Sequence, residues 1–277
     1  MNLFDAAIMG VVEGITEYLP ISSTGHLIVT GHLLGVQGEE RSKVFEIAIQ
    51  MGAIFAVLWA YRERFLSTFR GLGRDAKANT FFLNLCIAFI PAATIGFLFI
   101  KQIKALLFNA YGVAAASIIG ALIILWVERD AIRLQRENDA RIKEVDAMSP
   151  LDALKVGFTQ CFGLWPGMSR SGSTIIGGML FGLSRNAATE FSFFLGVPTL
   201  AAASVYSLYK DRALLSTPDV PLFAVGTVVS FIVALIVIRW LIGFVATHSL
   251  KAFAWYRLAF GGLILLTAWT GTIHWSA

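Results

Sequence analysis

Charged and hydroxyl-bearing side chains gather at two places in an otherwise apolar sequence. The first place holds Glu13 and Glu17, followed by the run Ser22-Ser23-Thr24-Gly25-His26. The second place is the run Pro166-Gly167-Met168-Ser169-Arg170-Ser171-Gly172-Ser173-Thr174. Carboxylates, a guanidinium, an imidazole and hydroxyls are groups that bind phosphate and move protons during its transfer.

The two acidic residues of the first place are four positions apart, so a helix puts them on one face. Two carboxylates at that spacing repel each other unless a cation lies between them. Oxygen ligands suit Mg²⁺ or Ca²⁺, and Mg²⁺ commonly joins one or two carboxylates to phosphate oxygens. We therefore expect Glu13 and Glu17 to hold a divalent cation, Mg²⁺ or Ca²⁺.

The remaining groups are suited to binding a phosphate and reacting with it. Arg170 offers a planar, permanently charged guanidinium, and His26 can act as a base, an acid or a nucleophile. Gly25 and Gly172 permit a positive φ or the close approach of a ligand. The hydroxyl groups that can donate hydrogen bonds or attack are those of Ser23, Ser169, Ser171, Ser173 and Thr174.

The composition excludes an ordinary soluble domain. Only 14% of the 277 residues are charged and the mean hydropathy is +0.72, whereas a soluble domain carries roughly 25% charged residues. Apolar runs near 44–61, 81–100, 111–127, 187–208, 221–241 and 253–273 are long enough to cross about 30 Å of hydrocarbon. They do not alternate as the strands of a membrane β-barrel do. The sequence therefore predicts an all-α membrane bundle with six spans.

Two further segments, 3–35 and 151–183, are too polar in the middle to be plain spans. Leu3 to Leu19 has the pattern of a helix, which Pro20 should end at or near Leu19, and Pro166 should end the helix that begins near 151. Each segment is predicted to form a helix, a polar loop and a second short helix, entering and leaving on one side. Each loop then opens a helix whose free N–H groups attract an anion.

The two halves of the chain echo each other in order. Pro20 to Gly25 resembles Pro166 to Gly172, the pattern Glu46-x5-Gly52 returns as Glu190-x5-Gly196, and Pro91-x4-Gly96 returns as Pro221-x4-Gly226. We predict one membrane domain, 1–277, with a first repeat at 1–127, a solvated helical cytoplasmic connector at 128–150 and a second repeat at 151–277. Because each half has three full spans, the second half should be inverted, which places a site near the bilayer midplane.

The positive charges predict how the chain is oriented. Segments 62–80, 128–155 and 239–257 fall on one side of the six-span arrangement and hold most of the 22 Lys and Arg residues. Cytoplasmic loops carry such an excess. This distribution, rather than nucleic-acid binding, accounts for the net charge of +4.

The two polar runs together resemble those of the undecaprenyl-diphosphate phosphatase family, also called the bacitracin-resistance proteins. The likeness covers nearly the whole chain and includes Phe45-Glu46 to Gln50 and Glu190-Phe191-Ser192-Phe193. The resemblance implies an enzyme that removes the terminal phosphate of undecaprenyl diphosphate, which regenerates the lipid carrier for cell-wall synthesis. It also implies a divalent cation and an active site that opens to the outer face of the bacterial cytoplasmic membrane.

The resemblance assigns roles residue by residue. Glu13 and Glu17 handle the metal or the diphosphate, and Arg170 binds the phosphate. Ser23 and His26 are the attacking group and its partner, and whether Ser23, His26 or a water attacks is left open. The residues expected to bind substrate are Ser22, Thr24, Gly25, Gly167, Ser169, Ser171, Gly172, Ser173 and Thr174.

Two other functions fit part of the pattern. Inverted repeats around broken helices are also transporter architecture, so a lipid flippase is an alternative. A structural membrane subunit is the other, although it leaves the clustered intramembrane charges without a purpose. Small residues such as those at 201–203 allow close packing and a homodimer.

Overall fold

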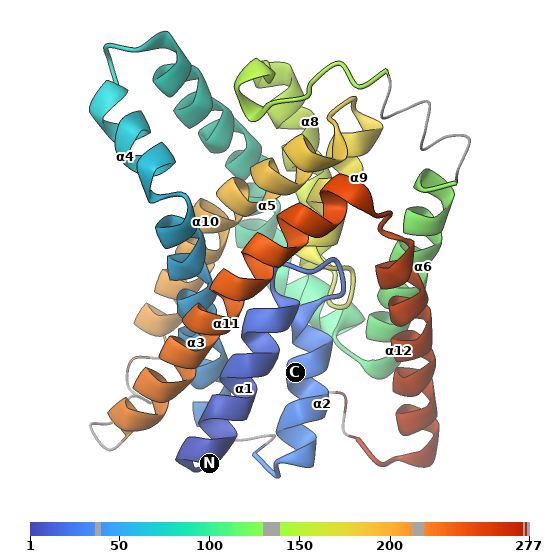
Figure 1. The fold of residues 1–277 in the computed structure, drawn as a ribbon. Coiled ribbons are helices and arrows are strands. Elements are labelled where there is room, and N and C mark those ends of the chain that lie inside the picture. The colour runs from blue at the N-terminus through green and yellow to red at the C-terminus, as the bar shows by residue number, and fades with distance from the viewer. Residues whose placement is uncertain (37–39, 130–138, 211, 213–218, 274, 276–277) are drawn as a thin grey trace.

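The computed structural model describes residues 1–277 except 37–39, 130–138, 211, 213–218, 274 and 276–277, and the regular structure of this described part is helical (Figure 1). One isolated bridge joins Ile142 to Leu183. The α-helices are α1 (Leu3–Thr16), α2 (Ser23–Leu33), α3 (Glu40–Ala60), α4 (Arg62–Gly71), α5 (Ala76–Leu107), α6 (Ala110–Val127), α8 (Pro150–Gln160), α9 (Arg170–Leu180), α10 (Arg185–Lys210), α11 (Val220–Thr247) and α12 (Lys251–Thr270). Two short 3₁₀ helices, η1 (Val145–Ala147) and η2 (Cys161–Leu164), lie beside α8.

The predicted membrane bundle is confirmed. Helices α5, α6, α10, α11 and α12 are long and apolar enough to cross a membrane, and α3 with α4, bent by 73°, passes the same test only when the pair is taken as one span. The predicted apolar runs fall on α3 and these five helices, whereas α4 lies in the segment 62–80 that was predicted to be a cytoplasmic loop. The structure is therefore that of a multi-pass membrane protein.

The two polar segments form the predicted helix–loop–helix hairpins. Figure 1 shows α1 and α2 entering from one end of the bundle and α8 and α9 from the other, with their loops near the middle. Helix α1 ends at Thr16, earlier than the predicted Leu19, because residues 17–21 already turn toward the second helix. These turns let α2 start at Ser23, beside the carboxylate of Glu17.

The connector differs from its prediction over the part that is described. Residues 130–138 lie outside the described residues, but 139–149 contain no α-helix, only the bridge residue Ile142 and the 3₁₀ turn η1. The side chains of Ile142, Val145 and Met148 are buried in the main apolar core. The charged residues between them suggested a solvated helix, whereas the apolar residues hold this strand-like segment against the bundle.

The two hairpins correspond to each other at a constant spacing of 147 residues. Asn2 caps α1 and Ser149 caps α8, and each forms a capping box with an Asp at the third helical position. Ser22 and Ser169 precede α2 and α9 with the same φ of 73°. The sequence match between Pro91-x4-Gly96 and Pro221-x4-Gly226 does not correspond to equivalent positions in the structure. Pro91 lies inside α5, whereas Pro221 lies in the first turn of α11. The division into two inverted repeats stays a proposal that the hairpins support.

Helix α11 packs closely against α1 and α3. At Gly52 of α3, an added Cβ would lie 2.3 Å from the carbonyl oxygen of Thr227 and 3.0 Å from the backbone nitrogen of Phe231. Glycine is therefore needed at this crossing because the neighbouring atoms are backbone and cannot rotate away.

We predict that Gly52→Ala destabilises the protein by about 1–3 kcal/mol, because an extra methyl group in a well-packed contact forces the helices apart. The measurement is the thermal unfolding midpoint of purified protein in detergent. Gly243→Ala on α11 is the matched control, since nothing lies within 4 Å of its added Cβ. Equal midpoints for the two variants would contradict the close crossing.

Candidate active site

The loops of the two hairpins enclose a polar cavity of about 140 Å³. It is lined by Glu17, Ser22, Ser23, Thr24, Gln50, Gly163, Trp165, Pro166, Gly167, Ser169, Arg170 and Leu200.

The first turns of α2 and α9 both border this cavity. Ser22 and Ser169 hold a φ of 73°, in a region that L-residues rarely adopt, and such strain costs on the order of 1–3 kcal/mol per residue. The Ser169 hydroxyl caps α9 by accepting from the N–H of Gly172, whereas the Ser22 side chain makes no capping bond. The first N–H groups of α2 are thus left without the usual side-chain acceptor, at the end of a helix that attracts anions.

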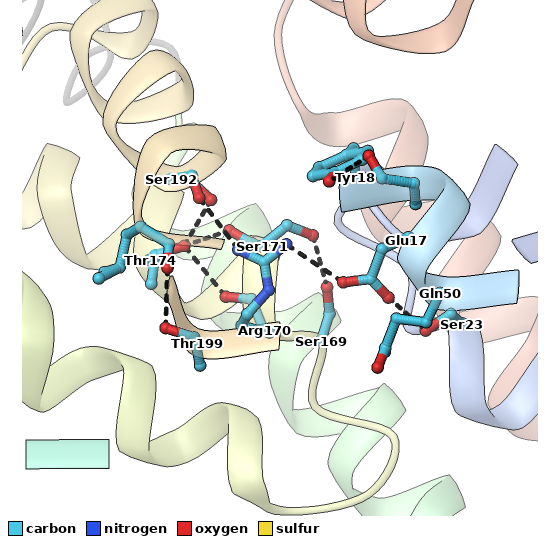
Figure 2. A network of polar contacts seen from close by, with 12 residues as sticks. Glu17, Tyr18, Ser23, Gln50, Ser169, Arg170, Ser171, Thr174, Ser192 and Thr199 are labelled. Atoms are coloured by element: carbon cyan, nitrogen blue, oxygen red, sulfur yellow. Dashed lines mark hydrogen bonds and ion pairs between the residues drawn. The ribbon is translucent and has the colours of Figure 1, made fainter. Parts of the chain in front are cut away.

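A direct contact between the two hairpins lies at the centre of the site (Figure 2). Arg170 donates from its Nη2 to Glu17 Oε1 at 3.2 Å, and both side chains are at least nine-tenths buried. Ser23 donates from its hydroxyl to the other carboxylate oxygen, Glu17 Oε2, at 2.8 Å. A carboxylate that already accepts from a hydroxyl is placed to take its proton.

The surroundings of Arg170 fix its guanidinium. Its Nη1 donates to the carbonyl of Ser192 at 3.0 Å, and its charge lies 5.8 Å from the centre of the Tyr18 ring. An added Cβ at Gly196 would lie 2.8 Å from Nη1, so glycine makes room for the group. The Nε atom is buried and has no hydrogen-bond partner among the described residues.

A second arginine holds the two loops together. Arg257 of α12 is 1% exposed, and its five N–H groups all donate to backbone carbonyls. Two bonds from Nη1 reach Pro20 in the first loop and Met168 in the second, at 3.2 and 2.8 Å. The remaining three reach Gly167, Ala116 and Ser117, at 3.1, 3.0 and 3.1 Å.

Comparison with known proteins identifies this architecture. The family model described as "Bacitracin resistance protein BacA" matches residues 6–263. The chain belongs to this family. A relative named "Undecaprenyl-diphosphatase" from Variovorax paradoxus is 57% identical over 274 residues, covering 99% of this chain and 98% of the relative. Two more relatives, "Undecaprenyl-diphosphatase 2" from Rhodospirillum rubrum and "Undecaprenyl-diphosphatase 1" from Chromobacterium violaceum, are each 56% identical over 275 residues. The matched region covers 99% of this chain in both cases, and 98% and 100% of the two relatives.

The predicted site residues fall into two groups, those that line the cavity and those that do not. The cavity is lined by the predicted residues Glu17, Ser22, Ser23, Thr24, Gly167, Ser169 and Arg170. The other predicted residues are not among those that line it: Glu13, Gly25, His26, Ser171, Gly172, Ser173 and Thr174.

Three of the predicted binding residues hold backbone or neighbouring side chains. Ser171 donates to the carbonyl of Leu19, which joins the second loop to the first, and Ser173 donates to the carbonyl of Ser169. Thr174 is bonded to Ser192 of α10 at 2.7 Å.

Of the two roles considered for Gly25 and Gly172, a positive φ is ruled out, because both residues lie inside helices. The two glycines allow close packing instead. An added Cβ would lie 3.0 Å from the Phe260 ring at Gly25 and 3.3 Å from Arg257 at Gly172.

His26 is not paired with Ser23, contrary to the expected arrangement. Its Nδ1 lies 2.7 Å from the carbonyl oxygen of Ser22, and its Nε2 lies 2.7 Å from the hydroxyl of Tyr256. Both ring nitrogens are thus engaged away from the Ser23 hydroxyl, which bonds Glu17.

Glu13 is the residue that best fits a cation. It is 1% exposed, and neither of its carboxylate oxygens has a hydrogen-bond partner among the described residues. It interacts electrostatically with Glu17, Glu46 and Arg170. The described part of the chain holds no group of three or more His, Cys, Asp and Glu side chains that could hold a metal. One or two carboxylates fit Mg²⁺, which takes further oxygens from phosphate and water.

The sequence missed several residues of the site. Arg257 was counted among the cytoplasmic charges, but α12 begins at Lys251 and carries it into the interior. The sequence did contain an indication of this role, since Arg257 lies inside an apolar run. A charged residue in a membrane is costly, so it usually has a functional or structural role. Gln50 and Trp165 also line the cavity. Gln50 accepts from Ser204 of α10 at 3.3 Å.

We predict that Arg257→Met destabilises the protein by roughly 3–5 kcal/mol, as expected for breaking a buried charged network. Arg257→Lys should lose most of the same stability, since an ammonium has three donors and no planar fork. Thermal unfolding in detergent measures both. Arg239→Met, at an exposed position of α11, is the control that should leave the midpoint unchanged. A wild-type midpoint for Arg257→Met would contradict the role of Arg257 in holding the two loops together.

Proposed function

We propose that this protein hydrolyses undecaprenyl diphosphate to undecaprenyl phosphate and inorganic phosphate, and so recycles the lipid carrier and confers bacitracin resistance. The observation that carries the proposal is the Glu17 carboxylate, which bonds the Ser23 hydroxyl on one oxygen and the Arg170 guanidinium on the other. This arrangement places a nucleophile, a base and an anion-binding group in one polar cavity of a membrane protein. The names of the full-length relatives supply the substrate.

In the reaction that we propose, Ser23 Oγ attacks the terminal phosphorus and Glu17 takes its proton. The bond between that phosphorus and the bridging oxygen breaks, and undecaprenyl phosphate leaves with the bridging oxygen. A water then attacks the phosphoserine, and inorganic phosphate leaves as Ser23 regains a proton. The hydroxyl is within hydrogen-bond reach of the base before substrate binds, as general-base catalysis needs.

The charge that moves onto the phosphoryl oxygens is met by groups that are already in place. Arg170, which lines the cavity, supplies a fixed cation. The first turn of α2 adds backbone N–H groups. Phosphoryl transfer depends mainly on positioning and such electrostatic stabilisation.

A divalent cation completes the proposed site. Glu13 would hold it, with Glu17 as the second carboxylate. Mg²⁺ or Ca²⁺ bound there would neutralise negative charge on the diphosphate.

We also propose that the protein lies in the bacterial cytoplasmic membrane with the cavity open to the outer side. The excess of Lys and Arg in the loops assigned to the cytoplasm supports this orientation. A homodimer stays a prediction from the small residues at 201–203.

The first test of the function is phosphate release from C55 diphosphate by purified protein in detergent with Mg²⁺. Arg170→Ala and Ser23→Ala should each lower kcat by about 10³-fold or more, on the scale of losing a transition-state cation or a nucleophile. Arg170→Lys should not restore the rate, because an ammonium cannot reproduce the planar fork. Arg239→Ala and Ser67→Ala, both at exposed positions, are the matched controls. Near-normal hydrolysis by Arg170→Ala would remove that residue from the reaction.

The cation has its own test. Excess chelator should stop hydrolysis, and added Mg²⁺ or Ca²⁺ should restore it. Glu13→Gln should raise the Mg²⁺ concentration needed for half-maximal rate, because the amide is a weaker ligand than the carboxylate. Binding of Mn²⁺, followed by electron paramagnetic resonance, gives a readout besides activity. Full activity in excess chelator would show that no cation is needed.

A further inference from the structure

His26 is not among the residues that line the cavity, and its ring is fixed by a stacking contact and two hydrogen bonds. It is 9% exposed, and its ring stacks on Phe260 with 4.1 Å between ring centres and 5° between planes. The two nitrogens lie 2.7 Å from the Ser22 carbonyl and 2.7 Å from the Tyr256 hydroxyl. A ring held by a stack and two short hydrogen bonds is not free to turn toward Ser23.

The partners of the two nitrogens define which one carries the proton. A carbonyl oxygen accepts and never donates, so Nδ1 must carry the hydrogen that it shares with Ser22. In the neutral ring Nε2 is then the acceptor, and the Tyr256 hydroxyl donates to it. The lone pair that a general base would use is therefore occupied by Tyr256.

In the other hairpin, a different side chain makes the equivalent hydrogen bond. Ser173 lies 147 residues after His26, the spacing that relates Ser22 to Ser169. Its hydroxyl donates to the carbonyl of Ser169 at 2.8 Å, as His26 does to the carbonyl of Ser22. In both halves, the residue four positions on holds the carbonyl of a serine whose φ is 73°.

In each half, the serine with the positive φ directly precedes the residue that bonds Glu17. Ser22 precedes Ser23, and Ser169 precedes Arg170, so the two strained turns aim the two groups that meet at Glu17. Because the conformation costs on the order of 1–3 kcal/mol, contacts to the carbonyl are needed to maintain it.

We infer that His26 is a positioning residue for Ser23 and that Tyr256 is a second one acting through it. The Nδ1–H of His26 maintains the strained Ser22 turn, and the Tyr256 hydroxyl keeps the ring in the required tautomer and orientation. Neither side chain touches the reacting atoms. This inference rests on the proposed hydrolysis and deepens it.

The test compares two substitutions of similar shape at His26. The amide nitrogen of an asparagine can occupy the place of Nδ1 and donate to Ser22, whereas leucine has the same branching and no donor. We expect His26→Asn to keep kcat within about tenfold of wild type and His26→Leu to lose about 100-fold, since a hydrogen bond and the strained turn are lost together. His26→Ser, which places at position 26 the residue type of Ser173, should have a higher kcat than His26→Ala, because serine keeps a donor and alanine has none. This second pair of variants replaces the first if His26→Leu does not fold.

A catalytic histidine gives the opposite pattern. If His26 were the base or the nucleophile, asparagine and leucine would lose activity equally, by about 10²- to 10⁴-fold. Equal losses in the two variants would overturn the inference, and so would full activity of His26→Leu. Thermal unfolding in detergent shows which variants are folded.

Tyr256 is tested by a double-mutant cycle. Tyr256→Phe alone should lower kcat by roughly 2- to 10-fold with little change in KM, the scale of one hydrogen bond. In the His26→Asn background the same change should have no further effect, because Tyr256 acts through the ring. Tyr206→Phe, on an exposed tyrosine of α10, is the matched control. Additive losses would show that Tyr256 acts independently and would overturn its role.

The wild-type rate separates this inference from the proposed function. If wild-type protein releases no phosphate from C55 diphosphate, the proposed hydrolysis fails. If wild type is active and the asparagine and leucine variants are equally impaired, only the positioning role fails.

Discussion

The structure depends on a buried guanidinium that satisfies the backbone of two broken helices. Irregular backbone inside a membrane protein is stable only where other protein groups or water pair its amides and carbonyls. Arg257 supplies five N–H groups to five carbonyls, and three of these, at Pro20, Gly167 and Met168, belong to the two polar loops. A guanidinium is suited to this task because its donors radiate in one plane and it accepts no hydrogen bond. Gly120 makes the position possible, since an added Cβ would lie 2.1 Å from Nη2 of Arg257.

The contacts of Arg257 bear on the proposed reaction because the two loops carry the groups that we propose take part in it. With Pro20 and Met168 held by one side chain, the turns at Ser22 and Ser169 are brought together, and Glu17 meets both Ser23 and Arg170. Ser171 adds a direct bond from the second loop to the Leu19 carbonyl of the first. The site therefore needs little reorganisation when a diphosphate arrives, which is the condition under which fixed charges lower a barrier most. The strain at the two serines is the local cost of aiming the adjacent side chains into one cavity.

Much of this arrangement could be predicted from sequence because it follows from local rules. The apolar runs predicted the membrane-spanning helices, and the intramembrane Glu17 and Arg170 indicated a shared site. The prolines predicted two broken segments, although α1 ends at Thr16 and α8 at Gln160, before Pro20 and Pro166. The long-range partners could not be predicted in the same way. Whether Ser23 bonds His26 or Glu17 depends on the turn at 17–21, and Arg257 lies 237 residues from the carbonyl of Pro20 that it binds. Gly25 and Gly172 drew attention as the flexible positions, but the positive φ values fall on the serines three residues earlier, where only tertiary contacts can hold them.

The central claim is that the two loops act on one phosphate together. Its most direct test is an experimental structure of the protein with a prenyl methylenediphosphonate, whose P–C–P bridge cannot be hydrolysed. The account predicts the terminal phosphonate in the cavity between the hairpins, with Ser23 Oγ facing its phosphorus and Arg170 bonded to its oxygens. A phosphonate bound to one loop alone, or in the separate apolar cavity lined in part by Ile123, Phe162 and Leu180, would contradict it.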